Sequence, residues 1–152
     1  MKFDFCVIGA TGMQGKIVTM DLINSGYSVL LCGRDKSRVE HLLNRYKKKT
    51  DFEYVDLTDI NNAARVIKKS GARVVINCAE GDQDLNSLLA CIKAGIHSID
   101  LGSDIPMTRQ QLALNKTLKK RGLIHITGCG SVPGIGNVML NYASQKLDRI
   151  DD

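Results

Sequence analysis

The chain has 152 residues, the length of one compact domain, and its 43% hydrophobic and 24% charged residues are typical of a globular protein. No apolar run reaches the roughly 18 residues that a membrane-spanning helix needs, and residues 1–5 lack a signal-peptide cleavage site, so we expect a cytoplasmic protein without a membrane partner. The net charge of +5 comes with only 5% aromatic residues on which bases could stack, and its basic clusters fall at expected helix ends, so nucleic-acid binding is not expected.

Short apolar runs alternate with stretches of helical length along the whole chain. The predicted strands are 3–8, 28–32, 52–55, 73–77, 97–101 and 123–127. The predicted helices are 12–25, 37–48, a helix that Thr58 caps, 84–94, 106–121 and 137–147. This alternation predicts an α/β fold, a Rossmann-type doubly wound parallel sheet of about six strands in the order 3-2-1-4-5-6 with helices on both faces.

We interpret residues 1–152 as one dinucleotide-binding domain. The sequence stops directly after the last predicted helix, without a flexible tail. We therefore expect a fragment of a longer chain, from which a substrate and dimerisation domain is missing.

The strongest motif is a glycine-rich turn placed after the first predicted strand and before the first predicted helix. Its residues fit the pattern G-x-x-G-x-x-G and are Gly9, Ala10, Thr11, Gly12, Met13, Gln14 and Gly15. In this pattern the first glycine makes the tight turn, the second lets the backbone approach a pyrophosphate, and the third lets the helix pack closely. Free amides at the helix start then point at the phosphates of NAD(P), and Thr11 and Gln14 can add side-chain hydrogen bonds.

The end of the second predicted strand indicates which dinucleotide binds. An acidic residue there would accept hydrogen bonds from both ribose hydroxyls of NAD, whereas an arginine accommodates the 2′-phosphate of NADP. The sequence has Gly33 and then Arg34, with Lys36 and Arg38 close by, which favours NADP over NAD. Asp35 keeps NAD as the second choice, since it can either reach the ribose or cap the next helix.

Two further strand ends belong to the predicted cofactor site. Asp56 and Leu57 follow the third strand, where adenine usually lies, and Asp56 can accept from the adenine amino group or cap the chain. Small residues follow the fourth strand at the switch point of the sheet, where the nicotinamide side has to pass. They are Asn77, Cys78 and Ala79, and the next residue, Glu80, is the one that packing explains least.

Four segments resemble the N-terminal NAD(P)-binding domain of the saccharopine dehydrogenase-like family: 7–15, 74–79, 94–100 and 128–134. The resemblance covers nearly the whole chain. It implies an oxidoreductase that acts on a C–N bond, the secondary amine or imine of an amino-acid derivative, by hydride transfer. It also implies a small amino-acid-derived substrate for the full-length protein, and it is compatible with a homodimer. We expect the isolated fragment to bind the cofactor but to be inactive.

The resemblance places Asp100 near the nicotinamide, where a carboxylate can act as an acid/base group or merely cap a loop. Val132 departs from the family, which commonly has an acidic residue before the Pro-Gly pair, and this puts the substrate in doubt.

Two alternatives remain open at this stage. Tyr142 and Lys146 form a Y-x-x-x-K match, preceded by Ser131, as in short-chain dehydrogenases, although the extra βα unit around Gly95 and Pro106 does not fit that class. The other alternative is a non-catalytic module that senses NADP. We predict no metal site, because the three histidines and five cysteines show no ligand spacing.

Overall fold

The computed structural model describes residues 2–79 and 83–149. Within them, six parallel strands form one sheet in the order β3-β2-β1-β4-β5-β6, which confirms the predicted topology. The strands are β1 (Phe5–Ile8), β2 (Val29–Gly33), β3 (Thr50–Tyr54), β4 (Val74–Asn77), β5 (His97–Asp100) and β6 (His125–Ile126). The helices are α1 (Met13–Asn24), α2 (Glu40–Arg45), α3 (Ile60–Ser70), α4 (Asp84–Ala94), α5 (Ile105–Ala113), α6 (Asn115–Arg121) and α7 (Ile135–Ser144), and a 3-10 turn (Lys36–Val39) precedes α2.

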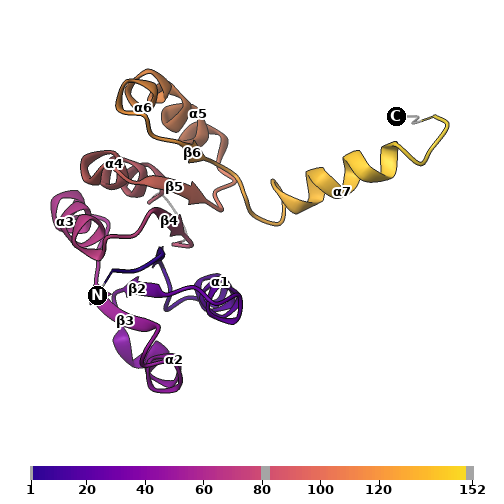
Figure 1. The fold of residues 1–152 in the computed structure, drawn as a ribbon. Helices are drawn as coiled ribbons and strands as arrows, with labels where there is room; N and C mark the ends of the chain where they lie inside the picture. Colours follow the sequence, from indigo (N-terminus) through magenta and orange to yellow (C-terminus); the bar gives the residue numbers. More distant parts are fainter. Residues whose placement is uncertain (1, 80–82, 150–152) are drawn as a thin grey trace.

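Helices cover both faces of the sheet. Figure 1 shows α1 and α2 on one face and α3 to α6 on the other. Strand β1 lies between the two layers: Cys6 and Ile8 belong to the core beside α3 and α4, and Val7 belongs to the core beside α1. Because neighbouring side chains of a strand point to opposite faces, a strand covered on both sides has to be apolar throughout, as the FCVI run of β1 is.

The predicted helix 106–121 is divided into α5 and α6. The helical hydrogen bonding changes at Leu114, which ends α5 and precedes α6. Leu114 and Leu118 pack in a small core with Leu88 and Ile92 of α4. The two leucines are four residues apart and would share one face of an uninterrupted helix as well, so this packing does not explain the break.

The start of α3 also differs from the prediction. Its N-cap is Asp59, whose side chain accepts a 2.9 Å hydrogen bond from the Asn62 amide. Thr58 instead donates its hydroxyl to Asp56. Aspartate and threonine are both good cap residues, and here the one that directly precedes the first helical residue takes the role.

Helix α7 extends away from the sheet and the other helices (Figure 1). Its sequence, IGNVMLNYAS, contains no charged residue, and none of its residues is buried. Large apolar side chains of this helix, such as Val138 and Leu140, are therefore more than 60% exposed. Among the described residues, no helix combines the length and the apolar character needed to cross a membrane.

Candidate functional site

The glycine-rich turn connects β1 to α1 at the carboxyl edge of the sheet. Gly9 has a φ of +75°, and the Ala10 amide donates a 3.0 Å hydrogen bond to the Cys32 carbonyl of β2. Gly12 precedes α1 without a side-chain cap, and the Lys16 amide donates to the Gly12 carbonyl at 3.1 Å. The amides between Gly12 and Lys16 lie at the positive end of the helix dipole. This arrangement suits a phosphate group.

Close packing requires glycine at two positions of the turn. A Cβ on Gly15 would collide with the Gly9 carbonyl oxygen and stand 2.7 Å from Ala10 Cα, so α1 can press against the turn only without a side chain there. A Cβ on Gly9 would lie 2.6 Å from the Ala79 nitrogen, beyond the end of β4. The geometry agrees with the predicted roles of Gly9 in turning and of Gly15 in packing.

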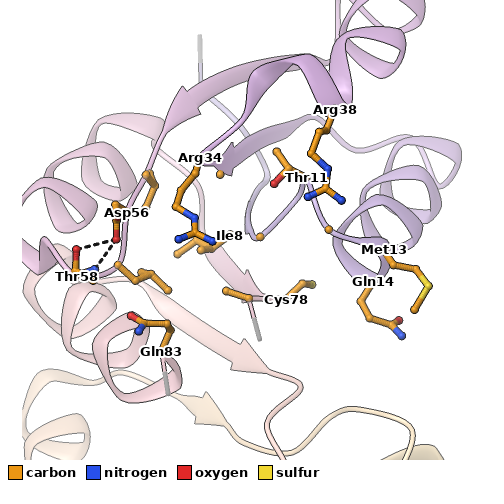
Figure 2. Close-up of a pocket in the computed structure, with 16 residues that line it drawn as sticks. Ile8, Thr11, Met13, Gln14, Arg34, Arg38, Asp56, Thr58, Cys78 and Gln83 are labelled. Carbon is orange, nitrogen blue, oxygen red and sulfur yellow. Dashed lines mark hydrogen bonds between the residues drawn. The ribbon is translucent and has the colours of Figure 1, made fainter. Parts of the chain in front are cut away.

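A pocket of about 650 Å³ opens beside this turn, at the carboxyl ends of β1, β2, β3 and β4. Its size falls within the roughly 300–1,000 Å³ that small-molecule sites occupy. Figure 2 shows side chains from several elements around it. The pocket is lined by Ile8, Gly9, Thr11, Gly12, Met13, Gln14, Gly33, Arg34, Arg38, Val55, Asp56, Leu57, Thr58, Cys78, Ala79 and Gln83.

Two arginines bring positive charge to the pocket. Arg34 directly follows β2, and Arg38 belongs to the 3-10 turn after it (Figure 2). Gly33 lets the phosphate-binding turn approach β2, since a Cβ at this position would stand 2.8 Å from Thr11 Cγ2. The glycine before Arg34 is thus explained by packing, and the arginine by its place in the pocket.

Asp35 is not among the residues that line the pocket. Its Oδ1 atom accepts hydrogen bonds from the Ser37 hydroxyl at 2.6 Å and from the Ser37 amide at 3.0 Å, which caps the 3-10 turn. The hydroxyl bond in particular lowers the pKa of Asp35. Of the two roles that the sequence leaves open for this residue, the geometry shows the cap.

Asp56 combines a capping role with a place in the pocket wall. Its Oδ1 atom accepts from the Thr58 amide at 2.9 Å and from the Thr58 hydroxyl at 2.8 Å (Figure 2, dashed lines). These two hydrogen bonds, with a smaller contribution from the charge of Arg34, hold the pKa of Asp56 below its usual value. The pocket therefore contains a carboxylate near one of its guanidinium groups.

Cys78 and Ala79 form the wall beyond β4, and Asn77 supports it from behind. The Cys78 amide donates a 2.8 Å hydrogen bond to the Ile8 carbonyl, and burial raises the pKa of the Cys78 thiol to about 12. The thiol thus stays protonated and acts as a small apolar group. Asn77 is buried and does not line the pocket, whereas Glu80 lies outside the described residues.

Asp100 is buried at the end of β5, where only 1% of its surface is exposed. Its carboxylate accepts hydrogen bonds from the amides of Gly102 (3.1 Å) and Gly128 (2.9 Å), the Thr127 hydroxyl (3.2 Å) and Gln111 Nε2 (2.6 Å). His125 Nε2 lies 3.2 Å from Oδ2, in a direction that is not that of a hydrogen bond.

The acid/base role predicted for Asp100 does not fit these surroundings. Burial alone would raise its pKa, but the His125 imidazole and the hydrogen bonds from Gly128 and Gln111 outweigh burial and lower the pKa to about 2. Asp100 is not among the residues that line the pocket, and both of its oxygens are engaged. The geometry instead supports the loop-capping alternative, because these contacts tie β5 to the loop after β6.

Most of the predicted cofactor residues come together around one cavity. Those that do not line it are Ala10, Gly15, Asp35 and Asn77. Sequence reasoning missed Ile8, Val55, Thr58 and Gln83. Ile8 and Val55 end two predicted strands, and this position at the carboxyl edge is a signal that could have found them. Nothing in the sequence marks Gln83.

Tyr142 of the Y-x-x-x-K pair lies on α7 and Lys146 lies just after its end, and neither residue lines the pocket. Tyr142 is 64% exposed, and Lys146 Nζ lies 5.4 Å from the centre of its ring. This geometry is a surface cation–π contact. Neither side chain meets the predicted cofactor residues, so the structure does not favour a short-chain dehydrogenase mechanism.

The fold, the turn and the pocket together define a dinucleotide-binding domain of the Rossmann type. Residues 5–126 match the family described as the saccharopine dehydrogenase NADP binding domain. The chain belongs to this family, which confirms the family resemblance and the prediction of NADP. The match includes three of the four sequence segments, and segment 128–134 lies outside it.

The chain is 25% identical over 146 residues to carboxyaminopropylagmatine dehydrogenase of Synechocystis sp., covering 90% of this chain and 36% of that protein. Its fold is similar to that of apo saccharopine dehydrogenase (L-Glu forming) of Saccharomyces cerevisiae, with a TM-score of 0.75, 20% identity and coverage of 95% of this chain and 30% of that one. A short-chain dehydrogenase from Streptomyces avermitilis has a TM-score of 0.60 at 13% identity, over 82% of this chain and 64% of its own. The structural likenesses show a shared fold, and the chain spans about a third of the first two proteins.

Proposed function

We propose that the pocket beside the glycine-rich turn holds NADP in a definite orientation. The amides of Met13 and Gln14 bind the pyrophosphate, because they lie at the start of α1 where the dipole favours anions. The Gly12 amide instead donates to the Gly9 carbonyl at 2.9 Å. The adenosine half extends toward Arg34 and Asp56. The nicotinamide half extends toward Cys78 and Ala79, at the switch point between β1 and β4.

One observation carries the position of the 2′-phosphate: Arg34 lines the pocket, whereas its neighbour Asp35 is held outside it by Ser37. A carboxylate in the pocket at this point would repel the phosphate and favour NAD. With the carboxylate of Asp35 used as a cap, the guanidinium groups of Arg34 and Arg38 outnumber Asp56, the one carboxylate among the described residues at this end of the cavity, and the net charge of this end is positive.

The same proposal extends to the whole protein. The domain supplies NADP to an oxidoreductase that acts on the C–N bond of an amino-acid-derived substrate, and NADPH provides the hydride for this chemistry when bound. Groups that orient the substrate, and any homodimer contact, belong to further parts of a longer chain. The names of the two relatives above, each a dehydrogenase, are in keeping with this assignment.

Calorimetry with NADPH and NADH tests the position of the 2′-phosphate. We expect Arg34→Ala and Arg38→Ala to weaken NADPH binding by tenfold or more, because each removes one charged partner of the phosphate, and to leave NADH binding unchanged. Lys36→Ala is the matched control, since Lys36 lies in the same segment but does not line the pocket. Equal losses for NADPH and NADH would contradict the proposal.

Turnover measurements test the proposal that the domain needs a further substrate domain for hydride transfer. The 152-residue chain should bind NADPH but not oxidise it when a 2-oxo acid and an amino acid are added, because hydride transfer requires a substrate oriented at the nicotinamide. Rapid NADPH oxidation by this chain alone would contradict the need for a substrate domain. Absence of turnover in a longer, natural form of the protein would instead favour the NADP-sensing alternative.

A further inference from the structure

Asp84 is a buried carboxylate that the proposed cofactor site does not use. It is the first residue of α4, only 6% of its surface is exposed, and it does not line the pocket. Its Oδ1 atom accepts a 2.7 Å hydrogen bond from Asn77 Nδ2, at the end of β4. Its Oδ2 atom occupies the space where a side chain on Gly102 would begin.

The contacts of Asn77 continue from Asp84 to the pocket wall. The Oδ1 atom of Asn77 accepts a hydrogen bond of 3.3 Å from the Ala79 amide, so the two ends of one side-chain amide join Asp84 to the wall. The backbone of Cys78 and Ala79 in turn lies against Gly9, with the Ala79 nitrogen 2.6 Å from the position of a Cβ there. Asp84, Asn77, Ala79 and the phosphate-binding turn thus form one continuous series of contacts.

We propose that Asp84 is a positioning residue for the nicotinamide half of the cofactor. It acts through Asn77, whose amide it fixes in the one orientation that presents an oxygen to the Ala79 amide. This keeps the wall of Cys78 and Ala79 in the shape that the nicotinamide half meets. The inference rests on the proposed placement of NADP.

The alternative, that Asp84 only stabilises the start of α4, explains less. An acidic residue in the first turn does interact favourably with the helix dipole, but an exposed one would do so without burial. Burial here, together with the charges of Asp100 and Asp104, raises the pKa of Asp84 to about 6, and Asn77 and His125 act in the opposite direction. A carboxylate kept in such a place at neutral pH costs stability, and its 2.7 Å hydrogen bond comes from Asn77, which supports the wall.

The test compares two ligands, NADPH and 2′,5′-ADP, by calorimetry on the 152-residue chain. The second ligand carries the adenosine and its 2′-phosphate but no nicotinamide. We expect Asp84→Ala to weaken NADPH binding roughly tenfold, the size of one lost hydrogen bond, and to leave 2′,5′-ADP binding unchanged. Asp84→Asn keeps an oxygen that accepts from Asn77, so it should recover most of the NADPH affinity.

Two further variants complete the design. Asp104→Ala is the matched control: it removes an exposed carboxylate that caps α5 through the Met107 amide at 2.8 Å, without contact to Asn77. It should change neither affinity. Should Asp84→Ala fail to fold, Asp84→Leu keeps the branched four-atom shape of the side chain without an acceptor and should show the same selective loss.

Each outcome decides the question. A loss for NADPH alone, reversed in Asp84→Asn, supports the positioning role. Equal weakening of both ligands means that Asp84 only maintains the fold, and unchanged NADPH binding in Asp84→Ala means that the wall does not depend on it; either result overturns the inference. Failure of 2′,5′-ADP to bind the unmodified chain would refute the proposed cofactor placement itself, which separates the two claims.

Discussion

The backbone nitrogen of Ala79 lies 2.6 Å from the point that a Cβ atom on Gly9 would occupy, so the phosphate-binding turn and the wall after β4 leave no room for a side chain. Gly9 also has a φ of +75°. We expect Gly9→Ala to lower the free energy of unfolding by about 3 kcal/mol or more, the combined effect of left-handed strain and collision. Urea denaturation measures this loss.

Gly26→Ala separates the two effects. Gly26 has a φ of +97°, but no atom lies within 4 Å of a Cβ built on it. Its substitution should cost only the conformational strain, about 1–2 kcal/mol. Equal losses in the two variants would show that the contact between Gly9 and Ala79 is unimportant.

Asp100 should contribute stability that acid removes. Its pKa of about 2 in the folded protein lies below the ordinary value of 3.8, so the folded state binds this proton more weakly than the unfolded chain. The contribution is complete above about pH 5, amounts to about 2 kcal/mol, and is lost as the pH falls toward 2. Asp100→Asn should therefore be less stable than the unmodified chain at pH 7, and the difference should shrink by pH 2.5. A difference that stays constant with pH, in urea titrations of both proteins, would contradict this assignment.

Asp84 should behave in the opposite way. Its folded pKa of about 6 lies above the ordinary 3.8, so ionisation is harder in the folded state and stability falls as the pH rises between these values. Asp84→Asn should be more stable than the unmodified chain at pH 8, by at most about 3 kcal/mol, and should lose this advantage by pH 4. Thermal unfolding across this range gives the comparison. The prediction is wrong if the variant is less stable at pH 8.

Tyr142 and Lys146 should not affect the cofactor site. Tyr142→Phe keeps the ring that Lys146 contacts, so we expect a change in unfolding free energy within about 0.5 kcal/mol. Lys146→Ala removes an exposed cation–π contact, which is worth about 0.5–1 kcal/mol. NADPH affinity, measured by calorimetry, should be the same in both variants and the unmodified chain. A tenfold loss in Tyr142→Phe would restore the short-chain dehydrogenase alternative.

The sheet could be predicted from the sequence because a parallel strand covered on both faces has to be apolar throughout, as β1 and β2 are. The glycine-rich turn could be predicted because its chemistry is local: its seven residues are consecutive, from the end of β1 to the first turn of α1. The division of the predicted helix 106–121 at Leu114 could not, since no glycine or proline stands between Met107 and Arg121 to mark it.

The surroundings of Asp100 could not be predicted from the sequence either. Its partners Gln111, His125 and Thr127 belong to later parts of the chain that meet only in the folded protein. The family resemblance, together with the position at the end of a strand, suggested a catalytic carboxylate, and only the three-dimensional contacts show that both oxygens are occupied. Asp35 is similar on a smaller scale, because the choice between ribose and Ser37 is decided by the direction of one side chain.

The two ends of the pocket are built by different halves of the sheet: Arg34 and Arg38 follow β2, and Cys78 and Ala79 follow β4. The residues that would recognise the 2′-phosphate are thus separated in space from the surface that would border the nicotinamide ring. Substitutions within the short segment 33–38 could therefore change the preference from NADP to NAD during evolution. The wall that borders the nicotinamide would stay the same.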